Sequence, residues 1–142
     1  APKAIDRLIS SFPVDEQPQI RASLSESLKY IVAQRLLPAK EGRKQVACFE
    51  VLKGTASIAN MIRDEKTYQI YSAMQAGQKF GMQTMNQSLA ELVQKRRISR
   101  EEALNRSTLP EELAGLLGTA PAPAAGAPAA VAGAGGSPFG RR

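Results

Sequence analysis

Residues 54–64, GTASIANMIRD, decide how the rest of the chain is organised. They follow an apolar run at residues 46–52 that is typical of a β-strand, and they open with small residues before a helical pattern begins. The apolar members of this pattern predict one buried stripe, formed by Ile58, Met61 and Ile62. The polar members lie off the stripe and are predicted to face water or a partner: Asn60, Arg63 and Asp64. A strand that leads directly into a helix is the arrangement in which α/β domains present functional groups.

The composition divides the chain into a foldable part and a tail. From position 119 to position 140 the sequence is almost entirely Ala, Pro and Gly, with one Phe and no charged residue. Such a segment cannot bury enough apolar surface to offset the entropy of ordering it. We therefore predict a folded part at residues 1–117 and a disordered tail at residues 118–142.

The net charge of +6 is mild for a chain of 142 residues. The tail contributes Arg141 and Arg142 and no acid, so the folded part holds 17 basic and 13 acidic residues. One basic cluster stands out, at Lys95, Arg96 and Arg97. It closes an amphipathic run, where cations complement the C-terminus of a helix. The alternative is a contact with nucleic acid or anionic lipid.

The types of residue present argue against several classes of site. The chain has no histidine and one cysteine, which removes the commonest general base and argues against a zinc site. That cysteine, Cys48, stands in an apolar strand pattern and is predicted to be a small core residue in a reducing compartment. No run approaches the roughly 18 apolar residues of a membrane span and no signal peptide opens the chain, so we expect a cytoplasmic protein.

The remaining pattern predicts an α-rich chain with one β-hairpin. The hairpin joins residues 29–37 to residues 46–52 through a polar loop. Helices are expected at residues 3–12, 15–28 and 66–76, from residue 85 to the basic cluster, and at residues 99–106 and 110–117. Gly77 is positioned to end a helix as its C′ residue, and Ser99 with Glu102 forms a capping-box pattern.

The predicted strand at residues 46–52 is largely apolar but carries one acid in its interior. Alternation places Val46, Cys48, Glu50 and Leu52 on the same side of the strand. Two explanations of Glu50 are open: an edge position in contact with water, or a carboxylate paired with an arginine or lysine.

The order of short motifs along the chain is more specific than its composition. The motifs are AIDRLI (4–9), FP (12–13), QIR (19–21), LLP (36–38), ACFEVL (47–52), IR (62–63), KT-x-QI (66–70), GMQTM (81–85) and ISREEA (98–103). Taken singly they are weak. In this order and spacing, residues 3–113 closely resemble the C-terminal half of the PilT family, the retraction ATPases of type IV pili in the secretion-ATPase superfamily.

The resemblance implies a fold and a cellular setting. Members of this family are cytoplasmic homohexameric motors at the inner-membrane base of the pilus, where they act with a platform protein. Each subunit has a PAS-like N-terminal domain and a RecA-like ATPase domain. The chain would be an α/β fragment, the C-terminal portion of the RecA-like domain, and would lie peripheral to the membrane without inserting into it. No nucleic acid is expected as a partner.

ATP and Mg²⁺ are the cofactors that the resemblance implies for the full-length family. The family's Walker A loop, Walker B acid and His box would all lie upstream of residue 1. The sequence itself contains no Gly-x-x-x-x-Gly-Lys-Ser/Thr loop. We therefore expect this chain alone to bind neither cofactor and not to hydrolyse ATP. No catalytic, cofactor-binding or metal-binding residue is assigned.

Residues 57–64 align with a family signature, Ala-Ile-Arg-Asn-Leu-Ile-Arg-Glu, which the family requires for retraction rather than for ATP hydrolysis. The residues assigned to this coupling motif are Ser57, Ile58, Asn60, Met61, Ile62, Arg63 and Asp64. The departure from the signature is Ala59, which replaces its first arginine and removes a charge-assisted contact. The resemblance therefore implies a coupling element in a diverged member, or a paralogue, of the retraction motor.

Two functions remain open from the sequence. The first is a C-terminal segment of a pilus retraction ATPase that supplies subunit packing and couples ATP hydrolysis to pilus disassembly. The second is a stand-alone, non-enzymatic interaction module that docks on a motor or another partner through residues 57–64. A nucleic-acid binder is disfavoured because aromatic residues are few and the charge is mild. The single cysteine excludes the tetracysteine zinc insertion of extension and type II secretion motors, which favours the retraction branch.

Overall fold

A computed structural model describes residues 1–42 and 44–118. Its elements, in chain order, are α1 (Pro2–Ser10), α2 (Gln17–Ser27), β1 (Tyr30–Pro38), β2 (Gln45–Lys53), α3 (Ala56–Arg63), the 3-10 helix η1 (Thr67–Gln69), α4 (Ile70–Ala76), the 3-10 helix η2 (Gln78–Phe80), α5 (Met85–Gln94), α6 (Arg100–Arg106) and α7 (Pro110–Leu116). The α-rich chain with one hairpin is confirmed. The tail predicted at residues 118–142 lies, apart from Gly118, outside the described residues.

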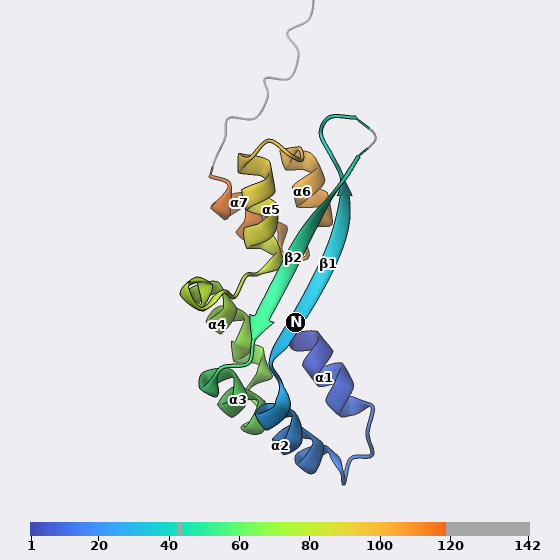
Figure 1. Cartoon of the computed structure of the whole chain (residues 1–142), viewed down its shortest axis with the longest axis vertical. Coiled ribbons are helices and arrows are strands. Elements are labelled where there is room, and N and C mark those ends of the chain that lie inside the picture. The colour runs from blue at the N-terminus through green and yellow to red at the C-terminus, as the bar shows by residue number, and fades with distance from the viewer. Residues whose placement is uncertain (43, 119–142) are drawn as a thin grey trace, which may run out of the picture.

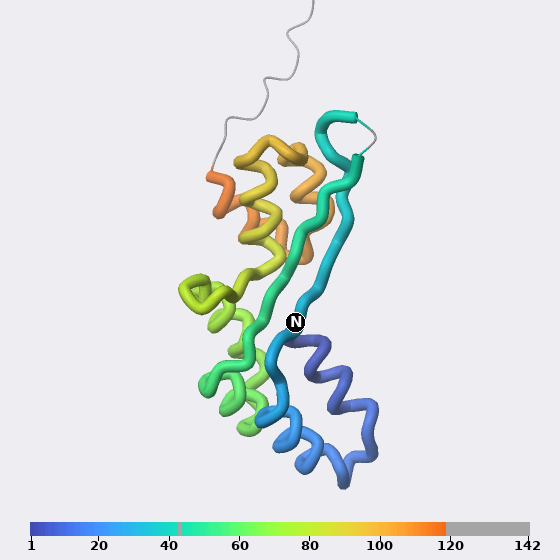
Figure 2. The backbone as a smooth tube through the Cα atoms, in the orientation of Figure 1, coloured from blue at the N-terminus to red at the C-terminus, as the bar shows by residue number. Residues whose placement is uncertain are grey.

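The antiparallel hairpin of β1 and β2 forms the long axis of the molecule (Figure 1). In its register Ile31 lies opposite Leu52 and Leu37 lies opposite Val46. Helices α5, α6 and α7 gather beside the half of the hairpin that carries its turn, and α1 to α4 gather at the other end (Figure 2). The hairpin thus runs past both helical groups and connects them.

Two hydrophobic cores correspond to these two groups. One contains Ile5, Ile9, Leu52, Ile58, Ile62, Ile70, Met74 and Met82. The other contains Leu37, Val46, Cys48, Leu89, Ala90, Ile98, Ala103 and Leu113. The strand β2 contributes to both, because Leu52 lies in the first core while Val46 and Cys48 lie in the second. The predicted burial of Cys48 is therefore confirmed.

Glu50 fits neither of the two explanations offered by the sequence. Its side chain is only 12 % exposed, so it is not open to water, and its carboxylate pairs with the ammonium group of Ala1, just before α1. The observed partner is therefore a cation, but it is neither an arginine nor a lysine.

Several predicted boundaries differ from the observed ones. The acids Asp15 and Glu16 precede α2 rather than occupying its first turn. Residues 66–76 form η1 followed by α4 rather than one helix. Ser99 caps α6 by accepting from the Glu102 amide at 3.1 Å, but the Glu102 carboxylate pairs with Arg106, so only half of the capping box forms. A complete capping box occurs instead between Thr84 and Gln87 at the start of α5.

Gly77 ends α4, but not in the conformation that the sequence predicted. Its φ is −88°, outside the left-handed region of a C′ glycine. A Cβ at this position would lie 2.7 Å from Met82 Cε and 2.9 Å from the Ala73 carbonyl oxygen. The residue is glycine because another part of the chain approaches it closely, and not because of its φ.

A hydrogen bond between Tyr71 and Glu112 joins α4 to α7. The phenol donates to both carboxylate oxygens, at 2.9 and 3.0 Å. Burial, with a further contribution from the Glu112 carboxylate, raises the pKa of Tyr71 from its usual 10 to about 12. The folded chain therefore retains a proton that the unfolded chain releases between these pH values, and stability should fall as pH rises from 10 to 12.

We expect the Tyr71→Phe variant to lose this pH dependence. The unmodified protein should lose about 1 kcal/mol of its unfolding free energy relative to Tyr71→Phe as the pH rises from 9 to 12. This value is smaller than the full pKa shift implies, because the phenol is partly exposed. Denaturant melts of both proteins at several pH values measure it. Parallel stability curves for the two proteins would show that Tyr71 keeps an ordinary pKa.

Candidate functional site: the exposed face of α3

The helix α3 begins directly after β2 because of a short, strongly determined turn. The Gly54 amide donates to the Lys29 carbonyl oxygen at 2.7 Å, which anchors the end of β2 against the start of β1. Thr55 then caps the helix, with its Oγ1 accepting from the Ile58 amide at 3.3 Å. The small residues that open the 54–64 stretch therefore set the direction in which α3 leaves the sheet.

The predicted stripe of α3 is its buried side. Ile58 and Ile62 are completely buried and Met61 packs against the same core. Four motif residues are exposed on the other side: Ser57, Asn60, Arg63 and Asp64. Ala59, at the position that departs from the signature, is half-buried. The structure thus brings all the exposed motif side chains together on a single helix, whose orientation is fixed by two core isoleucines.

The C-terminal end of α3 is connected to α2 by two arginines. Arg63 Nη2 lies 3.4 Å from Ser25 Oγ and 3.9 Å from Glu26 Oε1, and its side chain is half exposed. Arg21 is more buried, with 15 % of its side chain exposed, and donates from Nη1 to the Ile62 carbonyl oxygen at 3.4 Å. Its Nε lies 3.5 Å from Glu65 Oε1, close enough for an ion pair although not aligned for a hydrogen bond. The position of α3 therefore depends on α2.

The N-terminal end of α3 borders a hollow of about 440 Å³. Its lining includes Thr55, Ser57 and Ile58 from the start of α3 and Phe80 and Met82 from the segment after α4. Phe80 is 52 % exposed at this hollow. The start of the motif, at Ser57, thus lies beside a depression that is lined in part by apolar side chains.

Two residues of this surface were not assigned from the sequence. Arg21 belongs to the QIR motif that carried the resemblance, but nothing in its spacing indicated that it reaches the end of α3. Phe80 follows no periodic pattern, because η2 is a single turn. Only the folded arrangement brings either residue to the motif.

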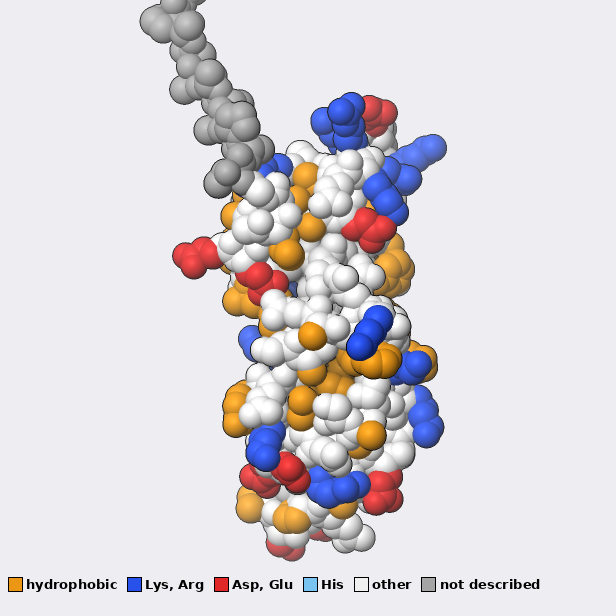
Figure 3. All heavy atoms as spheres, turned by 90° about the vertical axis from the view of Figure 1, so that its left-hand side faces the viewer, with side chains coloured by type: hydrophobic (Ala, Val, Ile, Leu, Met, Phe, Trp, Pro, Cys, Tyr) orange, Lys and Arg blue, Asp and Glu red, His pale blue; other side chains and the backbone are white. Residues whose placement is uncertain are grey.

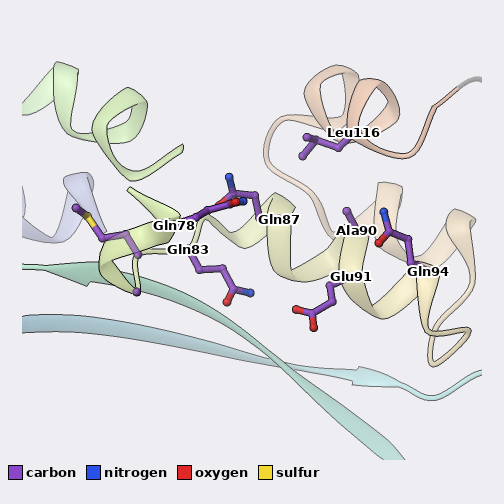
Figure 4. A pocket seen from close by; sticks show the side chains of 9 residues that line it. Gln78, Gln83, Gln87, Ala90, Glu91, Gln94 and Leu116 are labelled. Carbon is purple, nitrogen blue, oxygen red and sulfur yellow. The ribbon is translucent and has the colours of Figure 1, made fainter. Parts of the chain in front are cut away.

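A second hollow, also of about 440 Å³, lies away from α3 and is lined by amide side chains (Figure 4). The labelled residues come from η2, the segment after it, α5 and α7: Gln78, Gln83, Gln87, Ala90, Glu91, Gln94 and Leu116. Gln83 also pairs with the free edge of β2, where its backbone exchanges two hydrogen bonds with Val51, at 2.8 and 2.9 Å. The hollow contains no histidine or cysteine and one acid, so its chemistry is that of hydrogen bonding.

The described residues contain no cluster of side chains typical of a metal site. Within residues 1–42 and 44–118 no group of three or more carboxylates or thiols is close enough to hold a metal ion. The sequence offers no glycine-rich loop to surround a triphosphate. No chemical step is therefore assigned to ATP or Mg²⁺ among the described residues.

No protein-family model matches the chain. It is 44 % identical over 111 residues to the type IV pilus retraction ATPase PilT of Pseudomonas aeruginosa, a match that covers 78 % of the chain and 32 % of the relative. It is 41 % identical over 113 residues to a twitching motility protein of Neisseria gonorrhoeae, covering 80 % of the chain and 30 % of the relative. The chain thus spans about a third of the length of the curated relatives that it matches.

Comparison with solved structures also finds a pilus retraction ATPase. The pilus retraction motor PilT with bound ADP superposes with a TM-score of 0.70 at 39 % identity, over 79 % of this chain and 31 % of that one. The ATPase DotB of Legionella pneumophila shares the fold, with a TM-score of 0.59 at 18 % identity over 72 % of this chain and 28 % of that one. In sequence and in fold, the chain corresponds to the C-terminal portion of a PilT-like type IV pilus retraction ATPase.

Proposed function

We propose that the chain forms part of a motor ATPase that retracts type IV pili, and that α3 couples the ATP cycle of this motor to pilus disassembly. The observation that carries the proposal is the amphipathic helix α3. Its motif residues are anchored by Ile58 and Ile62 and present Asn60, Arg63 and Asp64 to solvent. A surface built in this way can transmit a movement of its domain to a bound partner without taking part in the chemistry.

The contacts of the exposed motif residues support this role. The Asp64 carboxylate lies 3.4 Å from Lys66 Nζ, and among the described residues the guanidinium of Arg63 makes only the long contacts to α2 given above. Exposed pairs of this kind contribute little to stability. The charged groups of α3 therefore remain free to bind a partner, for which we propose the platform protein at the inner-membrane base of the pilus.

An uncovered sheet face supports packing against further parts of a motor. The side chains of Tyr30, Val32, Leu36 and Phe49 are between 39 and 60 % exposed. They share one face of the hairpin, because Val32 lies opposite Val51 and Leu36 opposite Ala47 in the register. We propose that this face packs against the remainder of an ATPase domain within a hexameric ring, and that ATP and Mg²⁺ bind to residues outside the described part of the chain.

The proposed setting is cytoplasmic and peripheral to the membrane. Among residues 1–42 and 44–118, no helix has the length and apolar character needed to cross a bilayer. Attachment to the pilus machine would then depend on protein contacts such as that of α3.

A chimera tests the proposed function. In the PilT protein of Pseudomonas aeruginosa, the 111 matched residues are replaced by those of this chain, and twitching is measured in cells that lack their own PilT. We expect the chimera to hydrolyse ATP and to support twitching weakly. Ala59→Arg should increase twitching about tenfold, because it restores a charge-assisted contact of roughly 1.5–3 kcal/mol.

Two controls accompany this experiment. Ala4→Arg adds the same charge to an exposed position of α1 and should change nothing. Ala59→Lys restores the charge without the planar fork and should give an intermediate result. The proposal would be contradicted if the chimera hydrolyses ATP normally but supports no twitching, whether position 59 is alanine or arginine. That result would favour a stand-alone interaction module.

A further inference from the structure

A basic cleft lies at the end of the molecule that carries the hairpin turn, far from α3 (Figure 1). Its hollow of about 460 Å³ is bordered by Lys44 of the turn and by Lys95, Arg96 and Arg97 after α5, above a floor that includes Val46. Figure 3 shows Lys and Arg side chains gathered at this end of the molecule. Two segments that are 50 residues apart in the sequence thus place their cations around one depression.

The backbone holds these two segments together. The Lys40 amide donates to the Arg97 carbonyl oxygen at 2.8 Å, which joins the hairpin turn directly to the segment after α5. The end of α5 is a Schellman motif, in which the Arg96 amide donates to Val93 and the Arg97 amide to Leu92, both at 2.9 Å. Arg96 takes the left-handed position of this motif, with φ of 56°. Arginine therefore stands where glycine is the usual residue.

The charges of the cleft are largely uncompensated. Among residues 1–42 and 44–118, the ion pairs include Lys95 with Glu91 but none with Lys40, Lys44, Arg96 or Arg97. The acid within the lining is Glu41. A helix C-terminus explains one or two of these cations through its dipole. It does not explain why the hairpin turn contributes a further cation, Lys44, at the same place.

We propose that this basic cleft binds the anionic surface of a phospholipid membrane. Its cations are exposed lysines and arginines spread around a shallow depression, without a buried donor that would select one small anion. Its lining contains no aromatic side chain on which nucleic acid bases could stack. Each exposed cation near an anionic bilayer strengthens the electrostatic attraction between the protein and the membrane. This attraction requires neither base stacking nor a shaped pocket.

The proposal adds a second contact to the one proposed for α3. The hairpin turn and α3 lie at opposite ends of the molecule (Figure 2), so a membrane surface and a protein partner can be engaged together. The lipid contact does not depend on the retraction function, because vesicle binding is measured without pili and without ATP.

The experiment is flotation of the 142-residue chain with vesicles of phosphatidylcholine containing phosphatidylglycerol, and with vesicles of phosphatidylcholine alone. We expect binding to the anionic vesicles only, weakened by salt. The variant K44Q/R96Q/R97Q should bind on the order of 100-fold more weakly, since each cation near such a surface contributes about a fivefold factor. The matched control K3Q/R7Q/K29Q removes the same charge from exposed positions elsewhere and should bind like the unmodified chain. Circular dichroism verifies that both variants are folded.

Several outcomes would overturn the proposal. Absence of binding to anionic vesicles would do so directly, and an equal loss in the two triple variants would show that net charge rather than this cleft is responsible. If inorganic phosphate releases the chain from vesicles more strongly than chloride does at the same ionic strength, the cleft is a site for free phosphate instead. Binding of single-stranded RNA that is tighter than vesicle binding and is lost in K44Q/R96Q/R97Q would identify a nucleic acid site.

Discussion

Replacing Gly54 by alanine should destabilise the chain by at least about 3 kcal/mol. A Cβ at this position would lie 2.0 Å from the Leu28 carbonyl oxygen and 2.9 Å from the Leu28 carbonyl carbon. Both atoms belong to the backbone, so no side chain can rotate to relieve the overlap. The Gly54 amide also bonds to Lys29, and a displacement that relieved the overlap would break this bond and shift the start of α3.

The measurement is thermal unfolding followed by circular dichroism. We expect the melting temperature of Gly54→Ala to fall by about 10 °C or more. Gly115→Ala is the matched control, because Gly115 lies within α7 and a Cβ there meets no atom within 4 Å. This control should raise stability slightly, by about 0.5–1 kcal/mol, through the better helix propensity of alanine. Equal melting temperatures for Gly54→Ala and the unmodified chain would show that the turn between β2 and α3 is not tightly packed.

The sequence predicts the elements of this fold where their periodicity is strong. The apolar run at residues 46–52 predicts the strand β2 and the burial of Cys48, and the spacing of Ile58 and Ile62 predicts the buried side of α3. Both signals arise because burial selects apolar residues at a fixed period along one element. The exposed motif residues of α3 are then predicted by exclusion, as those that lie off the stripe.

Features that depend on contacts between distant segments could not be predicted in this way. The sequence predicts that Gly77 is a helix-ending glycine, but the structure shows that glycine is needed there because Met82 approaches it closely. Helices α3 and α5 each end with a non-glycine residue in the left-handed region, Glu65 at φ of 61° and Arg96 at φ of 56°. Neither end carries the glycine that marks a Schellman motif in a sequence. Arg21 reaches α3 only because α2 packs against it.

The second large effect is expected from Arg63→Ala in a motor that contains this chain. The Arg63 side chain is half exposed and, among residues 1–42 and 44–118, its guanidinium makes only long contacts to α2, so its removal should lower stability by less than about 1 kcal/mol. It is, however, the one arginine that the coupling motif retains, since the other position is Ala59. If α3 transmits motion to a partner through its charged face, we expect retraction to fall at least tenfold, the effect of losing one charge-assisted contact.

A control and a conservative variant refine this prediction. Arg7→Ala removes the same side chain from an exposed position of α1 and should leave retraction unchanged. Arg63→Lys retains the charge without the bidentate geometry and should retain part of the activity. If both Arg63→Ala and Arg7→Ala retract normally, the motif acts through its fold alone and the charged face of α3 has no partner.

The most direct test of the coupling role is to measure ATP hydrolysis and pilus retraction on the same Arg63→Ala protein, in the PilT chimera described above. We predict that ATP turnover stays within about twofold of the parent while retraction falls at least tenfold, because α3 binds a partner and takes no part in the chemistry. A parallel loss of ATP turnover and retraction would place Arg63 in the catalytic cycle and would contradict a coupling role for α3.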